Sequence, residues 1–307
     1  MVETATVREV GLRDGLQMIS TFFPTAAKLA WIEAELAAGV TDIEVCSFVP
    51  PRNIPQFADA VEVAEASVAM PGLNPSALVP NLKGAQRAVV TGMPELHFVL
   101  SVSEEHNLRN VQRTVQQSID EFRAVVALAR AQPFPVRVGA ALATALGCTI
   151  AGPVDPGRVI ELAHVLVEAG ADELSIADTV GYANPAQTRR LFEEACRTFG
   201  RRLPVAAHFH DTRGLGLANV YAAVEAGVRR FDASLAGLGG CPYAPGARGN
   251  IVTEDLVFLL ESMGLSTGID LGRLVEVRRI VARHLPDETL YGQIAKAGPP
   301  KGFARAA

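Results

Sequence analysis

The chain has 307 residues, of which 49% are hydrophobic and 20% charged, with a formal net charge of −5. This length suits one large domain or two ordinary ones, and the composition supplies a sizeable core. No long basic run is present, so we expect no nucleic-acid partner. No apolar stretch reaches the ~18 residues of a membrane span, and the first residues lack the pattern of a secretory signal. We therefore expect no membrane partner and a cytoplasmic location.

Short β-branched runs alternate with longer amphipathic segments along the chain. The runs predict eight strands, at Thr6–Val10, Asp42–Ser47, Ser76–Val79, Leu96–Leu100, Val136–Ala141, Glu173–Ala177, Val205–His210 and Arg230–Ser234. The amphipathic segments predict helices at Ala26–Ala38, Phe57–Ser67, Leu82–Val90, Val111–Ala131, Pro156–Ala169, Pro185–Phe199, Leu217–Ala226, Thr253–Ser262 and Leu271–His284. Three helices run into Gly39, Gly170 and Gly227, where a left-handed glycine can end a helix.

Eight strands that alternate with helices over about 250 residues predict a (β/α)₈ TIM barrel. A doubly wound open sheet is the alternative, but the first strand runs into Gly11-Leu-Arg-Asp-Gly15 and not into a GxGxxG turn. We expect a single catalytic domain over 1–307. It divides into a barrel at about 5–262 and a C-terminal helical extension at about 263–307.

The most informative motif is His208-Phe-His210, followed by Asp211, at the end of the seventh predicted strand. Residues two apart on a strand point to the same face, so both imidazoles can bind one metal ion. The alternative is two ordinary histidines in the core or on the surface. Asp14 and Asn250 follow other strands and would supply oxygen ligands at the same barrel mouth. Two imidazoles with oxygen donors fit Mg²⁺ or Mn²⁺, and zinc stays open.

Three further residues stand out by their positions. Arg13 precedes Asp14 after the first strand, and the pair is either functional or an ordinary surface ion pair. Glu44 interrupts the apolar run of the second strand, where a buried carboxylate needs a partner. It either holds an arginine or a histidine in place or acts in catalysis itself. Cys241 lies in the glycine-rich loop of residues 237–250 and is a candidate acid or base.

Six motifs together resemble the hydroxymethylglutaryl-CoA lyases of the TIM-barrel metallolyase superfamily. They are Gly11-Leu-Arg-Asp-Gly-Leu-Gln17, Ile43-Glu-Val-Cys-Ser-Phe48, Pro80-Asn-Leu-Lys-Gly84, Asp178-Thr179, His208-Phe-His-Asp211 and Gly237-Leu-Gly-Gly-Cys-Pro-Tyr-Ala244. The likeness runs from about residue 7 to about residue 285. It implies an acyl-CoA lyase that converts 3-hydroxy-3-methylglutaryl-CoA into acetyl-CoA and acetoacetate.

The resemblance also implies roles for individual residues. Asp14, His208, His210 and Asn250 would hold Mg²⁺ or Mn²⁺, and either Asp14 or His208 would act as the base. Arg13 would stabilise the enolate, Glu44 would support Arg13, and Cys241 would help to protonate the product. The residues expected near the acyl-CoA substrate are Gln17, Ser47, Asn81, Ser175 and Thr179. By analogy with the family, we expect a homo-oligomer, either a dimer or a tetramer.

Four positions at the barrel mouth depart from the family pattern. Met18 replaces an asparagine, Thr144 a cysteine and Thr149 a proline, and His106 stands where mitochondrial-type enzymes carry an apolar residue. These differences leave open a related substrate, such as citramalyl-CoA or a longer-chain 3-hydroxy-3-alkyl thioester. A Claisen-condensing synthase of the same superfamily is a further alternative.

Overall fold

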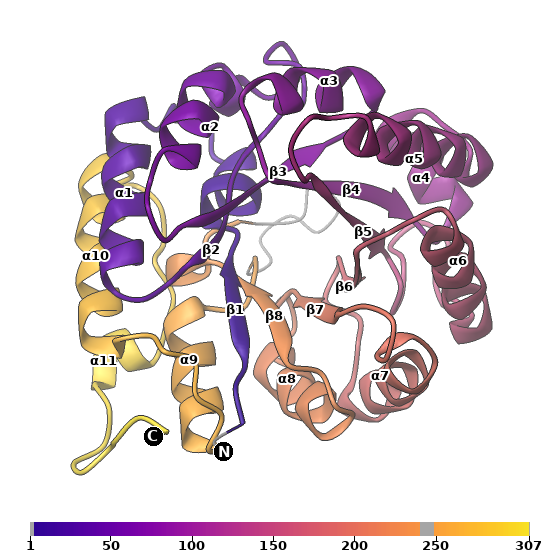
Figure 1. Cartoon of the computed structure of the whole chain (residues 1–307). Coiled ribbons are helices and arrows are strands. Elements are labelled where there is room, and N and C mark those ends of the chain that lie inside the picture. The colour runs from indigo at the N-terminus through magenta and orange to yellow at the C-terminus, as the bar shows by residue number, and fades with distance from the viewer. Residues whose placement is uncertain (1–2, 240–248, 307) are drawn as a thin grey trace.

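The computed structural model describes residues 3–239 and 249–306 (Figure 1). Within these residues, eight parallel strands pair in chain order, and β1 also pairs with β8 to close a barrel. The strands are β1 (Thr6–Glu9), β2 (Asp42–Ser47), β3 (Asn74–Val79), β4 (Glu95–Ser101), β5 (Arg137–Ala143), β6 (Glu173–Asp178), β7 (Val205–Phe209) and β8 (Arg230–Ala233). The predicted TIM barrel is therefore confirmed, and the open sheet is wrong.

Helices surround the barrel on its outside (Figure 1). They are α1 (Thr25–Ala37), α2 (Ala60–Val68), α3 (Leu82–Val90), α4 (Glu104–Val111), α5 (Val115–Arg130), α6 (Pro156–Glu168), α7 (Pro185–Phe199), α8 (Gly216–Glu225), α9 (Thr253–Ser262), α10 (Leu271–His284) and α11 (Ile294–Ala297). Gly39, Gly170 and Gly227 have φ of 97°, 100° and 97°, as their positions after α1, α6 and α8 predict. The glycine turns lead directly into the next strands.

One predicted helix is wrong in its extent. The segment 111–131 holds α5 and, at Val111, the last residue of a separate helix, α4. The break lies at Gln112, whose φ is 56°, and α5 then begins with a capping box between Thr114 and Gln117. The left-handed residue ends α4 and the capping box starts α5, so the two helices do not merge.

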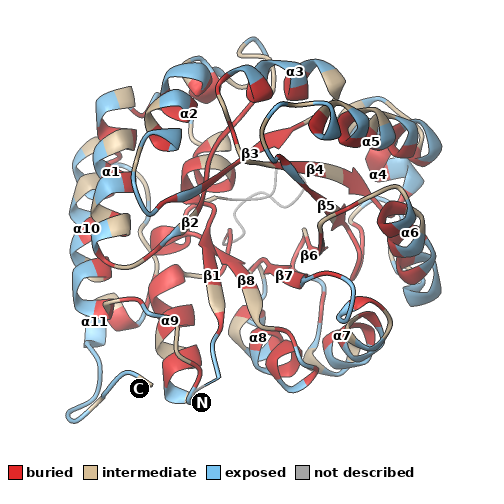
Figure 2. Cartoon of the chain, in the orientation of Figure 1, coloured by how far each residue is buried: buried red, intermediate tan, exposed pale blue. Residues whose placement is uncertain are grey.

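The hydrophobic core lies mainly between the barrel and its helices, where Figure 2 shows buried residues on the strands and on the inner helix faces. Trp31, Phe98, Phe122 and Phe231 are among its large, fully buried side chains. Beyond the barrel, α10 lies beside α1 (Figure 1), and the Asp270 amide donates to the carbonyl of Ala38. The limits of the barrel and of its C-terminal extension stay a prediction.

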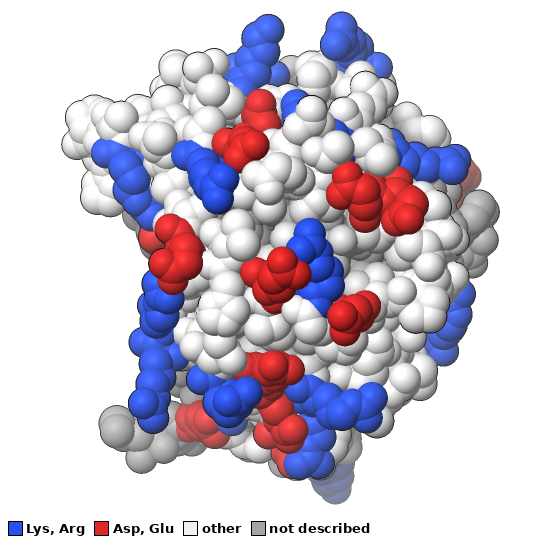
Figure 3. Space-filling view, turned by 90° about the vertical axis from the view of Figure 1, so that its right-hand side faces the viewer, with Lys and Arg blue, Asp and Glu red and all other residues white. Residues whose placement is uncertain are grey.

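Acidic and basic side chains are interspersed on the face that Figure 3 shows. Several pairs on the outer helices form ion pairs one turn apart, such as Arg158–Glu161 and Arg189–Glu193. Among the described residues, no helix is both long enough and apolar enough to span a membrane.

Candidate functional site

The first part of the site is a single turn of π-helix, Gly11–Gly15, that begins directly after β1. The amides of Arg13, Asp14 and Gly15 all donate to the carbonyl of Val10. Such short π-turns occur frequently at functional sites. Here the turn places Arg13 and Asp14 over the barrel mouth, where both line a large cavity. Asp14 is buried and the Arg13 side chain is only 12% exposed, so the pair is not an ordinary surface ion pair.

The second part is the end of β7, which carries His208 and His210. Their Nε2 atoms lie 3.2 Å apart. The Oδ2 atom of Asp14 lies 3.5 Å from Nε2 of His210 and 4.0 Å from Nε2 of His208. One potential ligand atom from each of these three residues lies within 4.8 Å of the others. The sequence therefore placed the imidazole pair and the carboxylate correctly at one point of the barrel mouth.

Asn250 joins this group from the segment that follows β8. It forms an antiparallel bridge with His210, while the amide of Ile251 donates to the carbonyl of Phe209. The Nδ2 atom of Asn250 donates to Oδ2 of Asp14 at 2.7 Å. Backbone pairing with the end of β7 thus fixes Asn250 against the carboxylate. Together, Asp14, His208, His210 and Asn250 form what we call the four-residue cluster.

The four-residue cluster fits a divalent cation. Its four side chains are buried, and Oδ1 of Asn250 and Nδ1 of His210 have no hydrogen-bond partner among the described residues. Buried polar atoms normally have partners, and two imidazole nitrogens that face each other beside a carboxylate are a typical set of metal ligands. Burial opposes the charge on Asp14, but Arg13 and the two histidines hold the pKa of its carboxyl well below the usual range. The carboxylate is thus ionised, as a ligand must be.

Asp232 on β8 orients His208 from below. Its Oδ2 atom lies 3.3 Å from Nδ1 of His208, and its Oδ1 atom accepts a hydrogen bond of 2.8 Å from Nε of Arg8. Despite burial, Arg8 and His208 hold the pKa of Asp232 below its ordinary range. A carboxylate on one imidazole nitrogen leaves the other nitrogen available as a ligand.

Glu44 on β2 supports Arg13. One carboxylate oxygen accepts from Nε of Arg13, and the other lies 2.9 Å from Nδ1 of His97. Burial opposes ionisation of Glu44, but Arg13 and His97 lower the pKa of its carboxyl. Of the two roles that the sequence left open, this geometry favours the one in which Glu44 holds an arginine and a histidine in place.

The other predicted site residues have mixed surroundings. Gln17, Asn81, Ser175 and Thr179 line the cavity. Gln17 also donates to Asp14, and Asn81 caps α3 through the amide of Gly84. Ser47 is buried and accepts from the amide of Val49, and it is not among the residues that line the cavity. Cys241 lies outside the described residues.

Sequence reasoning missed the charged group beneath the cluster. Arg8 on β1 donates to Asp232 and Glu173 and lies 2.8 Å from Nε2 of His97. Although burial and Arg8 oppose it, hydrogen bonds to Glu44 and Glu95 raise the pKa of His97 to about 9. The signal that could have found Arg8 and His97 is the one that marked Glu44: each is a polar residue within an apolar strand.

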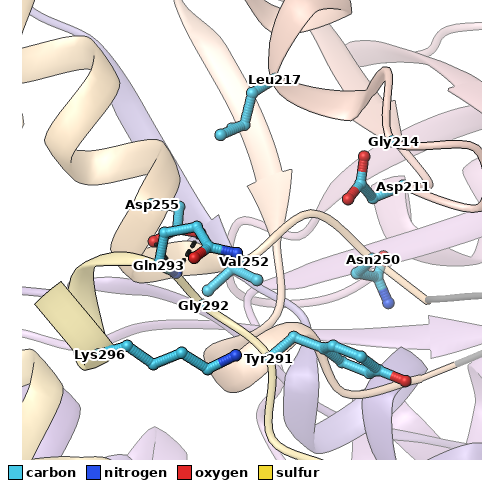
Figure 4. Close-up of a pocket in the computed structure, with 10 residues that line it drawn as sticks. All are labelled: Asp211, Gly214, Leu217, Asn250, Val252, Asp255, Tyr291, Gly292, Gln293 and Lys296. Carbon is cyan, nitrogen blue, oxygen red and sulfur yellow. Dashed lines mark hydrogen bonds between the residues drawn. The ribbon is translucent and has the colours of Figure 1, made fainter.

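A smaller cavity of about 130 Å³ lies beside the cluster (Figure 4). Asp211 and Asn250 line one side of it, while Tyr291 and Lys296 come from the C-terminal segment. The larger cavity, of about 760 Å³, contains Asp14, His208 and Arg13 in its lining. The larger cavity is therefore the one that can bring a substrate to the cluster.

Comparisons with known proteins agree with this geometry. The family model described as HMGL-like matches residues 5–281. The mitochondrial hydroxymethylglutaryl-CoA lyase of Arabidopsis thaliana is 38% identical over 277 residues, which cover 90% of this chain and 58% of that protein. A 3-hydroxy-3-isohexenylglutaryl-CoA/hydroxymethylglutaryl-CoA lyase of Pseudomonas aeruginosa is 41% identical over 275 residues, which cover 89% of this chain and 91% of that protein. A solved HMG-CoA lyase from Acinetobacter baumannii, in complex with coenzyme A and 3-methylmalate, has a TM-score of 0.91 and 40% identity and covers 98% of this chain and 97% of that one.

Proposed function

Because this chain belongs to the HMGL-like family, we propose that it is a carbon–carbon lyase that cleaves 3-hydroxy-3-methylglutaryl-CoA into acetyl-CoA and acetoacetate. The observation that carries the proposal is the convergence of the four-residue cluster beside Arg13 at the mouth of the 760 Å³ cavity. The named relatives and the solved neighbour support the same activity.

The reaction divides into three tasks. A base takes the proton of the C3 hydroxyl, the C2–C3 bond breaks, and its electron pair passes to C2 as a thioester enolate. The carbonyl that forms at C3 belongs to the acetoacetate product. An acid then protonates C2 to give acetyl-CoA. The site must therefore hold a base, stabilise an enolate oxygen and deliver one proton.

A divalent cation, held by Asp14, His208, His210 and Asn250, would supply the Lewis acidity that makes the C3 hydroxyl easier to deprotonate. We propose Mg²⁺ or Mn²⁺, because the set combines imidazoles with oxygen donors and needs no thiolate. Asp14 and His208 are the candidate bases. Asp14 is ionised, and His208 is oriented through its Nδ1 atom by Asp232.

Arg13 stabilises the enolate. Its guanidinium lies in the cavity lining with Nε on Glu44 and Nη1 on Asp14, so its position is fixed before substrate arrives. A preorganised cation at the thioester oxygen is worth most in a buried site, because it costs no reorganisation during the reaction. Cys241 is our candidate for the acid, and the prediction rests on its place in the glycine-rich loop.

The substrate enters from the mouth of the barrel. Gln17, Asn81, Ser175 and Thr179 line the cavity and stay our predicted substrate-binding residues. Ser47 stays one as well, although it is buried and does not line the cavity. A homo-oligomer stays a prediction by analogy with the family, and a cytoplasmic location stays a prediction from the sequence.

The test is cleavage of 3-hydroxy-3-methylglutaryl-CoA by the full chain with Mg²⁺ or Mn²⁺, followed by release of acetyl-CoA. We expect turnover in the wild type and its loss in His210→Asn. The matched control is His164→Asn, at an exposed position on α6, which should retain activity. Condensation of acetyl-CoA with a 2-oxoacid, in the absence of lyase turnover, would instead identify a synthase.

A further inference from the structure

The side-chain amide of Asn250 is fixed from two sides. Its Nδ2 atom donates to Oδ2 of Asp14 at 2.7 Å and to the carbonyl of Leu238 at 3.2 Å. An amide nitrogen carries two hydrogens, so both are used. The Oδ1 atom has no hydrogen-bond partner among the described residues and is the atom available to a cation. The Leu238 carbonyl therefore helps to determine which end of the amide serves as a ligand.

The chain after Leu238 packs closely against both oxygen ligands. A Cβ atom at Gly239 would lie 2.8 Å from Nδ2 of Asn250 and 3.2 Å from the carbonyl oxygen of Asp14. A displacement of this backbone by a few tenths of an ångström would therefore press on the Asn250 amide or release it. The position of Leu238 and Gly239 matters to the cation site even though neither side chain belongs to the four-residue cluster.

A turn with an unusual backbone conformation precedes Leu238. It is the 3₁₀ turn Leu235–Gly237 after β8, and its middle residue, Ala236, has φ of 59° and ψ of 14°. The left-handed conformation is unfavourable for alanine, because its Cβ atom comes close to the following carbonyl oxygen. Such a residue persists only where its surroundings hold it in place. We call this segment the left-handed turn.

Two hydrogen bonds hold the backbone of Ala236. Its amide donates to Oε2 of Glu254 on α9 at 3.0 Å, and its carbonyl accepts from the amide of Tyr291 at 2.8 Å. Tyr291 lies between α10 and α11 and lines the small cavity together with Asn250 (Figure 4). A Cβ atom at Gly237 would lie 3.4 Å both from Cβ of Tyr291 and from the carbonyl oxygen of Asn250. The left-handed turn is thus packed between the C-terminal segment and the backbone of a cation ligand.

Arg278 on α10 connects the two groups that hold Ala236. Its Nη1 atom donates to Oε1 of Glu254 and, at 2.7 Å, to the carbonyl of Tyr291. The Glu254 side chain is fully buried, and that of Arg278 is 13% exposed. Burial raises the pKa of the Glu254 carboxyl, and Arg278 opposes this effect. Without Arg278, the Glu254 carboxyl would hold a proton more tightly and accept less strongly from the Ala236 amide, because ionised acceptors form the stronger hydrogen bonds.

We infer that Arg278 is a positioning residue for the divalent cation that the four-residue cluster binds. It fixes the left-handed turn, and the turn orients Asn250 through the carbonyl of Leu238. The inference rests on the proposed cation site. It makes α10 and the C-terminal segment part of the unit that binds the cation, in addition to the barrel itself. The expected effect of Arg278 is therefore on metal affinity, beyond any effect on the stability of the fold.

The experiment titrates the metal-depleted full chain with Mn²⁺ and follows binding by electron paramagnetic resonance, well below the melting temperature of each variant. Arg278→Met removes both hydrogen bonds and keeps an apolar stem of similar length. Loss of a group that orients a ligand typically weakens metal binding 10–100-fold, and Arg278 acts through intermediates, so we expect the Mn²⁺ dissociation constant to rise about tenfold. Arg278→Lys keeps the charge and can donate to one of the two oxygens, and its affinity should lie between those of Arg278→Met and the wild type.

Arg279→Met is the matched control. Arg279 is the next residue on α10, its side chain is 78% exposed, and it pairs with Glu276 on the same helix. The same chemical change at this position should leave Mn²⁺ affinity unaltered. A tenfold loss in Arg278→Met, with partial recovery in Arg278→Lys and none of the loss in Arg279→Met, supports the inference.

The contrary results bear on separate claims. Wild-type Mn²⁺ affinity in Arg278→Met, even with a lower melting temperature, would show a merely structural role and overturn the inference while leaving the cation site intact. An equal loss in Arg279→Met would also overturn it. If Arg278→Met does not fold, Arg278→Lys decides, and affinity equal to that of the wild type counts against the inference. Failure of the wild type to bind Mn²⁺ would overturn the proposed cation site itself.

Discussion

Replacement of Glu44 by glutamine tests the support that holds Arg13, the residue that we propose stabilises the enolate. Glu44 is 1% exposed, and its carboxylate accepts from Nε of Arg13 and contacts His97. Glutamine keeps the shape and can still accept one hydrogen bond, but it removes the charge. A hydrogen bond to a charged partner is worth roughly 2 kcal/mol, of which a neutral acceptor retains part. The loss of charge, together with a less firmly placed guanidinium, should cost about 2 kcal/mol of transition-state stabilisation, which corresponds to about 30-fold in kcat/KM.

The assay is steady-state release of acetyl-CoA. The loss should fall mainly on kcat, because the role that we propose for Arg13 is to stabilise charge that develops during the reaction. Glu95→Gln is the matched control. Glu95 also contacts the imidazole of His97, at 3.1 Å, but its hydrogen bonds do not reach Arg13. Activity of Glu44→Gln within twofold of the wild type would refute the reasoning. Equal losses in both variants would place the effect in His97 and not in Arg13.

Three further predictions concern the cation, the π-turn and pH. Removal of divalent cations with EDTA should stop cleavage, and Mg²⁺ or Mn²⁺ should restore it; activity that survives chelation would contradict the cluster's role. Gly11→Ala should lower the melting temperature, because its Cβ would lie 2.5 Å from Oε1 of Glu9 and 2.9 Å from Cζ2 of Trp31, and such overpacking costs about 1–3 kcal/mol. Gly272→Ala on α10, with its nearest contact at 3.4 Å, is the control and should not lower it. Burial raises the pKa of Glu9 to about 7, so the folded state holds this proton more tightly than the unfolded chain does. The stabilisation that protonated Glu9 contributes is then complete below about pH 4 and is lost as pH rises through 7. The melting temperature of Glu9→Gln should therefore decrease less over this pH range than that of the wild type.

The sequence was sufficient for the barrel because each strand is a short apolar run and each following helix has its own periodicity. Glycine at the ends of α1, α6 and α8 marked where the chain returns to the sheet, and φ near 100° at these glycines agrees with that interpretation. The break between α4 and α5 was missed because it depends on Gln112, a residue type that seldom adopts a left-handed conformation. The local signal that could have found the break was the Thr114-x-x-Gln117 capping box, which marks the start of α5.

The site was predictable in the same uneven way. His208 and His210 were found from their spacing, and Asp14 from its position after a strand, because parallel strands bring their carboxyl ends to one mouth. The contact of Asn250 with Asp14 depends on a bridge to His210 that no local pattern shows. The contact of Arg8 with Glu173 and His97 was not predictable either, since these residues lie on three different strands and only the barrel brings them together.

The central claim is that side chains from β7, from the turn after β1 and from the segment after β8 bind one divalent cation. Titration of the metal-depleted chain with Mn²⁺, followed by electron paramagnetic resonance, measures this directly and without turnover. The account predicts one bound Mn²⁺ per chain in the wild type and in His164→Asn, and severe loss of affinity in Asp14→Asn and in His210→Asn. Unchanged Mn²⁺ affinity in the Asp14 and His210 variants would contradict it.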